Sequence, residues 1–113
     1  MECYRIKQNG KVIIDGPVYV ANSFLDRFFG LMGRKKIDEE EGLLLKNTSS
    51  IHTSFMKFTI DVIYLNKDYN VIYKETVKPW RVGKIVKGCK HVIELNENKK
   101  DRFQLDKIEI EKR

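Results

Sequence analysis

Short apolar runs separated by turn-forming residues make up most of this sequence, and they constrain the fold more than any other feature. A polar stretch at residues 66–70 predicts a hairpin loop between two of these runs. A chain of many short strands must pair its strand edges or cover them. We therefore predict a mainly β (α+β) fold, a small antiparallel or mixed β-sandwich or barrel-like domain. The predicted strands are residues 43–45, 52–58, 60–65, 71–77, 82–86, 89–95 and a half-exposed last strand at 107–111.

The N-terminal part predicts a hairpin followed by one short helix. The dipeptide Asn9-Gly10 readily adopts positive φ at both centres of a tight turn, so it should join two paired strands. Asn22 or Ser23 can cap a helix around residues 23–31, because Phe and Leu side chains follow at helical spacing. The predicted strands in this part are residues 4–8, 11–15 and, after a Gly-Pro break, 18–20.

Length and composition narrow the class of protein. A chain of 113 residues fits one domain, residues 1–113, and 42% hydrophobic residues suffice for a core. The charged N-terminus does not resemble a signal peptide, and no apolar run nears the ~20 residues that span a bilayer. We therefore expect a cytoplasmic protein with no membrane partner, in which Cys3 and Cys89 are free thiols. The formal charge of +6 identifies no partner, because both signs are common in the sequence.

His52 and Met56 are candidate site residues, because an extended backbone would send both side chains to one face. One interpretation is a pocket wall that offers an acid/base or ligand nitrogen beside a soft sulfur. The other is a core face with a hydrogen-bonded histidine, since methionine usually fills gaps. Asp61 begins an apolar strand, where an acid must be solvated, hydrogen-bonded or paired. It either orients His52 or satisfies backbone N–H groups at the start of the strand.

The cysteines and histidines could be metal ligands or chemical groups. Cys89 and His91 form a C-x-H pair, and together with Cys3 and His52 they equal the number of ligands in a tetrahedral zinc site. Their spacing matches no zinc motif, and a buried cysteine is ordinarily a small hydrophobe, so we predict neither a metal nor another cofactor. Cys89 is also a candidate nucleophile.

A basic stripe between residues 74 and 90 surrounds Trp80 and is opposed only by Glu75. One interpretation is a phosphate-tracking surface with a stacking ring for nucleic acid, and the other is a solvated sheet edge guarded by lysines. No nucleophile elbow, phosphate-binding loop, dinucleotide fingerprint or H-E-x-x-H motif occurs, so no reaction is identified by a motif. The cations of the stripe are Lys74, Lys78, Arg81, Lys84, Lys87 and Lys90.

Several short blocks follow one another along the chain: RFFGLMGR at residues 27–34, EGLLL at 41–45, IHT at 51–53, MKF at 56–58, IDV at 60–62, PWR at 79–81 and VIEL at 92–95. In this order they resemble the prokaryotic family called domain of unknown function 192. The resemblance implies a β-sandwich or barrel-like fold, a small helix with the Gly-Leu-Met block, and no established enzyme activity or cofactor. The family pattern singles out Arg34, His52, Met56, Asp61, Trp80, Arg81 and Glu94.

Such a mixture of polar and large side chains suits a cleft, although an arginine with an acid can equally be a buried scaffold pair. The leading hypothesis is a non-catalytic binding domain for a small anionic molecule or a peptide. One alternative is a small hydrolase-like enzyme with His52 as general base, Asp61 as its orienting group and Cys89 as nucleophile. The other is nucleic-acid binding by the basic stripe. The predicted binding residues are His52, Met56, Trp80 and Arg81, with Arg34 and Glu94.

Overall fold

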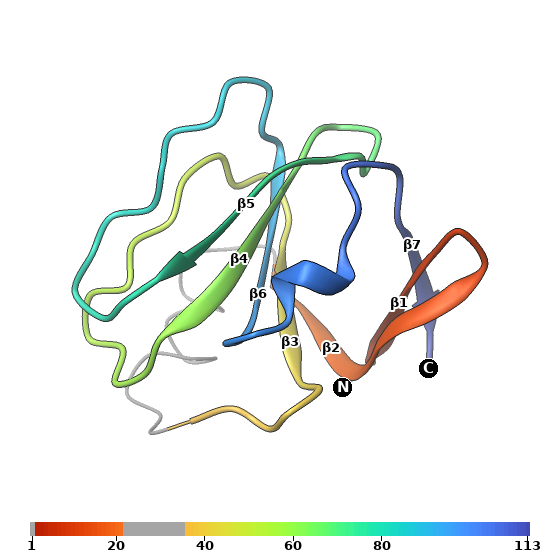
Figure 1. Cartoon of the computed structure of the whole chain (residues 1–113), viewed down its shortest axis with the longest axis horizontal. Coiled ribbons are helices and arrows are strands. Elements are labelled where there is room, and N and C mark those ends of the chain that lie inside the picture. The colour runs from red at the N-terminus through yellow and green to blue at the C-terminus, as the bar shows by residue number, and fades with distance from the viewer. Residues whose placement is uncertain (1, 22–35) are drawn as a thin grey trace.

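The computed structural model describes residues 2–21 and 36–113 (Figure 1). Seven strands form one mixed sheet, so the predicted mainly β class is confirmed, although the sheet does not close into a barrel. These two ranges contain a single 3-10 turn and no α-helix, and the helix predicted around residues 23–31 lies outside the described residues. The elements are β1 (Tyr4–Gln8), β2 (Lys11–Ala21), β3 (Gly42–Leu45), β4 (Ile60–Leu65), β5 (Val71–Val77), β6 (His91–Asn96), η1 (Lys100–Arg102) and β7 (Glu109–Lys112).

The strands lie in the order β5-β4-β6-β3-β2-β1-β7, and all neighbours are antiparallel except β2 and β3. The long strand β2 is shared between two partners. Its first part pairs with β1, where Ile14 faces Ile6, and its last part pairs with β3, where Val20 faces Leu44. An isolated bridge between Asn70 and Lys107 ties the β4–β5 loop to the segment before β7.

Two predicted hairpins are confirmed. Asn9 and Gly10 have φ angles of 54° and 78°, as a tight turn between twisted strands requires, and β1 and β2 pair on either side of them. The polar residues 66–70 join β4 to β5, and the Asn66 side chain accepts the backbone N–H groups of Asp68 and Asn70. These short loops fix the register of the strands that they connect.

The predicted break at Gly16 is wrong, because β2 continues through it to Ala21. Gly16 has a φ of 90°, and a Cβ atom at this position would lie 2.5 Å from the carbonyl oxygen of Tyr4. The register with β1 shifts at this level, between Tyr4 and Ile6. Gly16 therefore forms an irregularity within a continuous strand, which lets β2 leave β1 and join β3.

The strands predicted at residues 52–58 and 82–86 are wrong, because these segments are loops joined by one isolated bridge between His52 and Val82. Phe55 and Trp80 have φ angles of 67° and 61°, which turn the chain out of an extended path. Their alternating apolar pattern therefore reflects loops that partly cover a core. The last two strands, β6 and β7, begin at His91 and Glu109 rather than at residues 89 and 107.

Two apolar cores lie on opposite faces of the central strands. Leu43 and Leu45 of β3 point into the first core, whereas Leu44 between them points into the second. No helix in the described ranges is long and apolar enough to cross a membrane. The first core includes Ile51, Met56, Ile60, Val62, Tyr64 and Val92, and the second includes Ile6, Ile14, Ile63, Leu65, Ile93, Leu95, Phe103 and Ile108.

Candidate functional site

The residues of the predicted cleft lie in different environments. Trp80 and Arg81 are exposed and His52 is half-buried, while Met56 lies within the first core. Glu94 is fully buried on β6, and Arg34 lies outside the described residues. The structure thus brings His52, Trp80 and Arg81 into two adjoining loops, whereas Met56 and Glu94 belong to the interior.

Thr53 joins these two loops. Its buried hydroxyl donates to the carbonyl oxygen of Lys78 at 2.6 Å and accepts the backbone N–H of Arg81 at 2.8 Å. Its carbonyl oxygen accepts the backbone N–H of Trp80 at 3.0 Å, and its own N–H donates to the carbonyl oxygen of Arg81 at 2.8 Å. One residue therefore fixes the loop at residues 51–56 against the loop at residues 78–83.

An exposed aromatic pair lies at the tip of these loops. Phe55 packs edge-on against Trp80, with ring centroids 4.8 Å apart and ring planes inclined by 61°. Phe55 was not among the residues chosen from the sequence, because an extended segment would have placed it opposite His52 and Met56. The positive φ at Phe55 overturns that geometry and brings its ring to Trp80.

Asp61 has a structural role in β4. Its carboxylate is fully buried and accepts hydrogen bonds from the hydroxyl of Thr76 and from the backbone N–H groups of Lys99 and Lys100, at 2.7–2.8 Å. These contacts fasten the start of η1 to the sheet. Of the two interpretations drawn from the sequence, satisfaction of backbone N–H groups matches this arrangement, but these groups lie at the start of η1 and not at the start of β4.

The side chains of Cys89 and His91 have separate hydrogen-bond partners. The single S–H of Cys89 lies within hydrogen-bond distance of the carbonyl oxygens of Thr48 and His91, and burial raises the pKa of the thiol, so the nucleophilic thiolate is disfavoured. The His91 ring accepts the backbone N–H of Asn47 at its Nδ1 atom and stacks on Tyr69 with ring centroids 4.7 Å apart. Neither Cys3 nor Cys89 forms a disulfide, and no metal-binding group of three His, Cys, Asp or Glu residues occurs in the described ranges.

The basic stripe divides in space. The Lys74 ammonium donates to the carbonyl oxygen of Phe103, and Lys84 lies 5.0 Å from the centre of the Tyr73 ring. Lys78, Arg81 and Lys87 are exposed in the loop that carries Trp80. The Lys74 ammonium is therefore engaged within the fold, whereas the exposed cations of the stripe follow the loop that carries Trp80.

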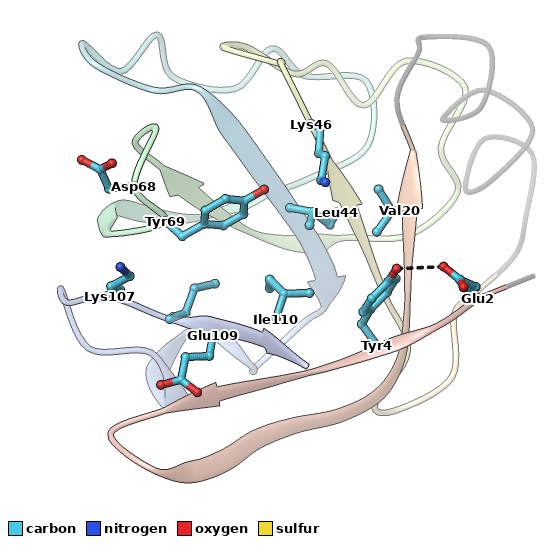
Figure 2. A pocket seen from close by; sticks show the side chains of 11 residues that line it. Glu2, Tyr4, Val20, Leu44, Lys46, Asp68, Tyr69, Lys107, Glu109 and Ile110 are labelled. Atoms are coloured by element: carbon cyan, nitrogen blue, oxygen red, sulfur yellow. Dashed lines mark hydrogen bonds between the residues drawn. The ribbon is translucent and has the colours of Figure 1, made fainter. Parts of the chain in front are cut away.

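A hollow of about 900 Å³ opens on the other side of the sheet, where the second core reaches solvent (Figure 2). Its apolar floor consists of Val20, Leu44, Ile108 and Ile110. Half-buried Tyr4 and Tyr69 lie on opposite sides of it in Figure 2. The charged residues of its lining are Lys46, Lys107, Glu2, Asp68 and Glu109.

Sequence reasoning missed this hollow because its lining comes from segments far apart in the chain. Val20 and Leu44 adjoin through the parallel β2–β3 pair, and Ile110 arrives on β7 by way of β1. Figure 2 shows Leu44 and Ile110 directed into the same space from opposite walls. The alternation of Ile108 and Ile110 with charged residues was the available signal, since a half-exposed strand must bury its apolar side somewhere.

The free energy of unfolding should depend on pH through His91, which stacks on Tyr69 beside the hollow. Burial, with Lys46 and Lys90 nearby, lowers the pKa of His91 below its ordinary value of 6.5. Protonation therefore favours the unfolded chain, so the free energy of unfolding should be highest above pH ~6.5 and decrease as pH falls toward the folded-state value. Urea unfolding between pH 7.5 and 5.5 measures this decrease. His91→Gln, which keeps a hydrogen-bond acceptor but does not titrate, should flatten it, and an unchanged pH profile would contradict the assignment.

Two solved structures share this fold. A candidate transcription regulator from Sinorhizobium meliloti superposes with a TM-score of 0.75 over 96% of this chain and 92% of that one. A protein of unknown function from Novosphingobium aromaticivorans superposes with a TM-score of 0.71 over 96% of this chain and 84% of that one. Both are 18% identical to this chain, so the likeness establishes the fold alone.

The class of protein is thus a small mainly β domain with a single mixed sheet. The chain belongs to the DUF192 family, described as Uncharacterized ACR, which matches residues 4–109 and confirms the resemblance seen in the sequence. It is 37% identical over 101 residues to the UPF0127 protein PH1112 of Pyrococcus horikoshii, covering 83% of this chain and 87% of that protein. It is 35% identical over 92 residues to the UPF0127 protein PYRAB11210 of Pyrococcus abyssi, covering 79% of each.

Proposed function

We propose that this protein is a non-catalytic, cytoplasmic binding domain that accepts an extended peptide segment in the hollow beside β7. The observation that carries the proposal is the opening of the second core to solvent at Val20, Leu44 and Ile110. A hollow of about 900 Å³ lies at the upper end of the size range of ligand sites and has room for several side chains.

The free edge of β7 supports a peptide rather than a compact small molecule. The N–H of Arg113 donates to the carbonyl oxygen of Cys3, directly before β1, whereas the N–H of Ile108 donates away from β1 to the carbonyl oxygen of Tyr69. Because donors alternate along an antiparallel strand, the backbone N–H of Ile110 points to the side opposite β1. That edge borders the hollow, so an added strand would bond to the backbone while its side chains enter the apolar floor.

The charges around the hollow also favour a peptide over the small anionic molecule expected from the sequence. Lys46 and Lys107 would attract an anion, but Glu2, Asp68 and Glu109 would repel it. A peptide with residues of both signs can match such a rim. The contacts of Asp61 and Cys89 give little support to the hydrolase hypothesis. The Asp61 carboxylate already accepts backbone N–H groups at the start of η1, and burial disfavours the Cys89 thiolate.

The test is selection of linear heptapeptides from a phage-displayed library on the wild-type protein, followed by affinity measurements on the enriched peptides. Val20→Trp fills the hollow and should weaken their binding about tenfold or more, because the displaced side chains lose their apolar contacts. Val12→Trp is the matched control, since Val12 is exposed and lies outside the hollow. Equal affinity for both variants, or no enrichment at all, would contradict the proposal.

A further inference from the structure

The loop surface opposite the hollow has an unusual set of exposed apolar side chains. Phe55 and Trp80 are each 59% exposed, Val82 is 76% exposed and Ile85 is 82% exposed. Trp80 and Val82 are two residues apart in the same loop, and Phe55 packs on Trp80. We call this set, together with the exposed cations Lys57, Lys78, Arg81, Lys84 and Lys87, the aromatic–basic surface.

The backbone beneath this surface is held in place. The N–H of Gly83 donates to the carbonyl oxygen of Ile51 at 2.9 Å, and the N–H of Lys84 donates to the Glu75 carboxylate at 2.8 Å. The buried hydroxyl of Tyr64 donates to that same carboxylate. With the Thr53 contacts described above, these bonds keep Val82 and Ile85 from turning inward. The apolar exposure is therefore a property of the folded backbone, and rigid exposed apolar patches mark interaction sites.

Positive charge dominates the two loops. Neither residues 42–60 nor residues 76–93 contain a single aspartate or glutamate, although acids are common elsewhere in the chain. The Glu75 carboxylate, at the edge of this region, already accepts two hydrogen bonds. Exposed cations interspersed with exposed apolar side chains are complementary to an anionic surface with an apolar interior.

We infer that the aromatic–basic surface docks the protein on the face of an anionic lipid bilayer. The aliphatic tips Val82 and Ile85 would enter the acyl boundary, Trp80 would lie at headgroup level, and the cations would meet lipid phosphates. Single-stranded nucleic acid suits the surface less well. The edge-on packing of Phe55 and Trp80 covers a face of one of the two rings, and exposed valine and isoleucine offer no platform for a base.

Docking of this kind leaves the hollow accessible. In Figure 1 the loops before β4 and between β5 and β6 lie together on one side of the molecule, and β1 and β7 lie on the other. The inference therefore does not depend on the proposed peptide site. It also differs from the expectation of no membrane partner, which considered only spanning segments and an export signal.

The experiment uses vesicles of phosphatidylcholine with about 30% phosphatidylglycerol, and pure phosphatidylcholine vesicles as the neutral comparison. Trp80 is the sole tryptophan, so its emission should shift to shorter wavelength when the surface enters the anionic bilayer. In sedimentation, the affinity for neutral vesicles should be at least about tenfold lower than the affinity for anionic vesicles. Binding to anionic vesicles should weaken with added salt.

Two double variants distinguish insertion of Val82 and Ile85 into the bilayer from nonspecific adsorption through exposed apolar side chains. Val82→Ser with Ile85→Ser should weaken binding to anionic vesicles about tenfold, because two apolar tips no longer leave water. Val12→Ser with Leu105→Ser removes two exposed apolar side chains elsewhere and should leave binding unchanged. Equal binding by both double variants, equal binding to neutral and anionic vesicles, or an unshifted Trp80 emission would overturn the inference. So would tighter binding to a single-stranded oligonucleotide, which would assign the surface to nucleic acid instead.

Discussion

Asp61→Ala is expected to lower the free energy of unfolding by about 3–5 kcal/mol, the largest single effect that we anticipate. The substitution leaves the backbone N–H groups of Lys99 and Lys100 and the hydroxyl of Thr76 without their acceptor. Asp61 is fully buried, so water cannot replace the lost carboxylate without opening the structure. Urea unfolding followed by far-ultraviolet circular dichroism measures the change.

Two further variants make the Asp61 result specific. Asp68→Ala removes an exposed carboxylate on the β4–β5 loop and should change the free energy of unfolding by no more than about 0.5 kcal/mol. Asp61→Asn keeps the volume and one acceptor oxygen, so its loss should be intermediate. If Asp61→Ala proved as stable as Asp68→Ala, the anchoring role would be refuted and a functional role for Asp61 would regain interest.

Thr53→Val is expected to lower the free energy of unfolding by about 2–4 kcal/mol. It leaves the carbonyl oxygen of Lys78 and the N–H of Arg81 without the hydroxyl that bonds them in a buried site. The variant keeps the shape of threonine, so a packing defect contributes little. Beyond stability, the two loops should separate locally, and Trp80 should lose its contact with Phe55. Urea unfolding, with Trp80 emission of the folded state as a second measurement, follows both effects.

Thr53→Ser is the matched control for this prediction. Serine keeps the hydroxyl and loses one methyl group, so the expected cost is about 1 kcal/mol. A larger loss for serine than for valine would mean that the methyl group, and not the hydrogen bonds, joins the loops. In that case the rigid aromatic–basic surface would need another explanation.

Local signals in the sequence predicted the hairpins well, for physical reasons. Asn9-Gly10 suits positive φ at both turn positions, and the β4–β5 pair follows from alternation on either side of a short polar loop. Gly16 shows where such signals mislead. A Gly-Pro pair commonly ends a strand, yet here glycine bends a strand that continues because β3 supplies a second partner.

The candidate sites were predicted only in part, because they depend on which distant segments meet. Trp80 and Arg81 were identified by residue type, and they do lie in one loop beside His52. The positive φ of Phe55 and Trp80, neither of which is glycine, could not be read from residue type. The hollow was missed altogether, since it requires the pairing of β7 with β1 and of β3 with β2, which local patterns do not specify.

The pairing of β1 with β7 places Tyr4 opposite Lys112, so β1 cannot complete its pairing until all of the chain between them has been made. The Gln8 side chain has the same dependence, since it accepts the N–H of Gln104 and donates to carbonyl oxygens of the same late segment. A nascent chain therefore carries the β1–β2 hairpin with one unpaired edge until β7 has been made. Contacts this distant slow folding and expose unpaired backbone, so chaperone protection has its greatest value at that edge until β7 pairs with it.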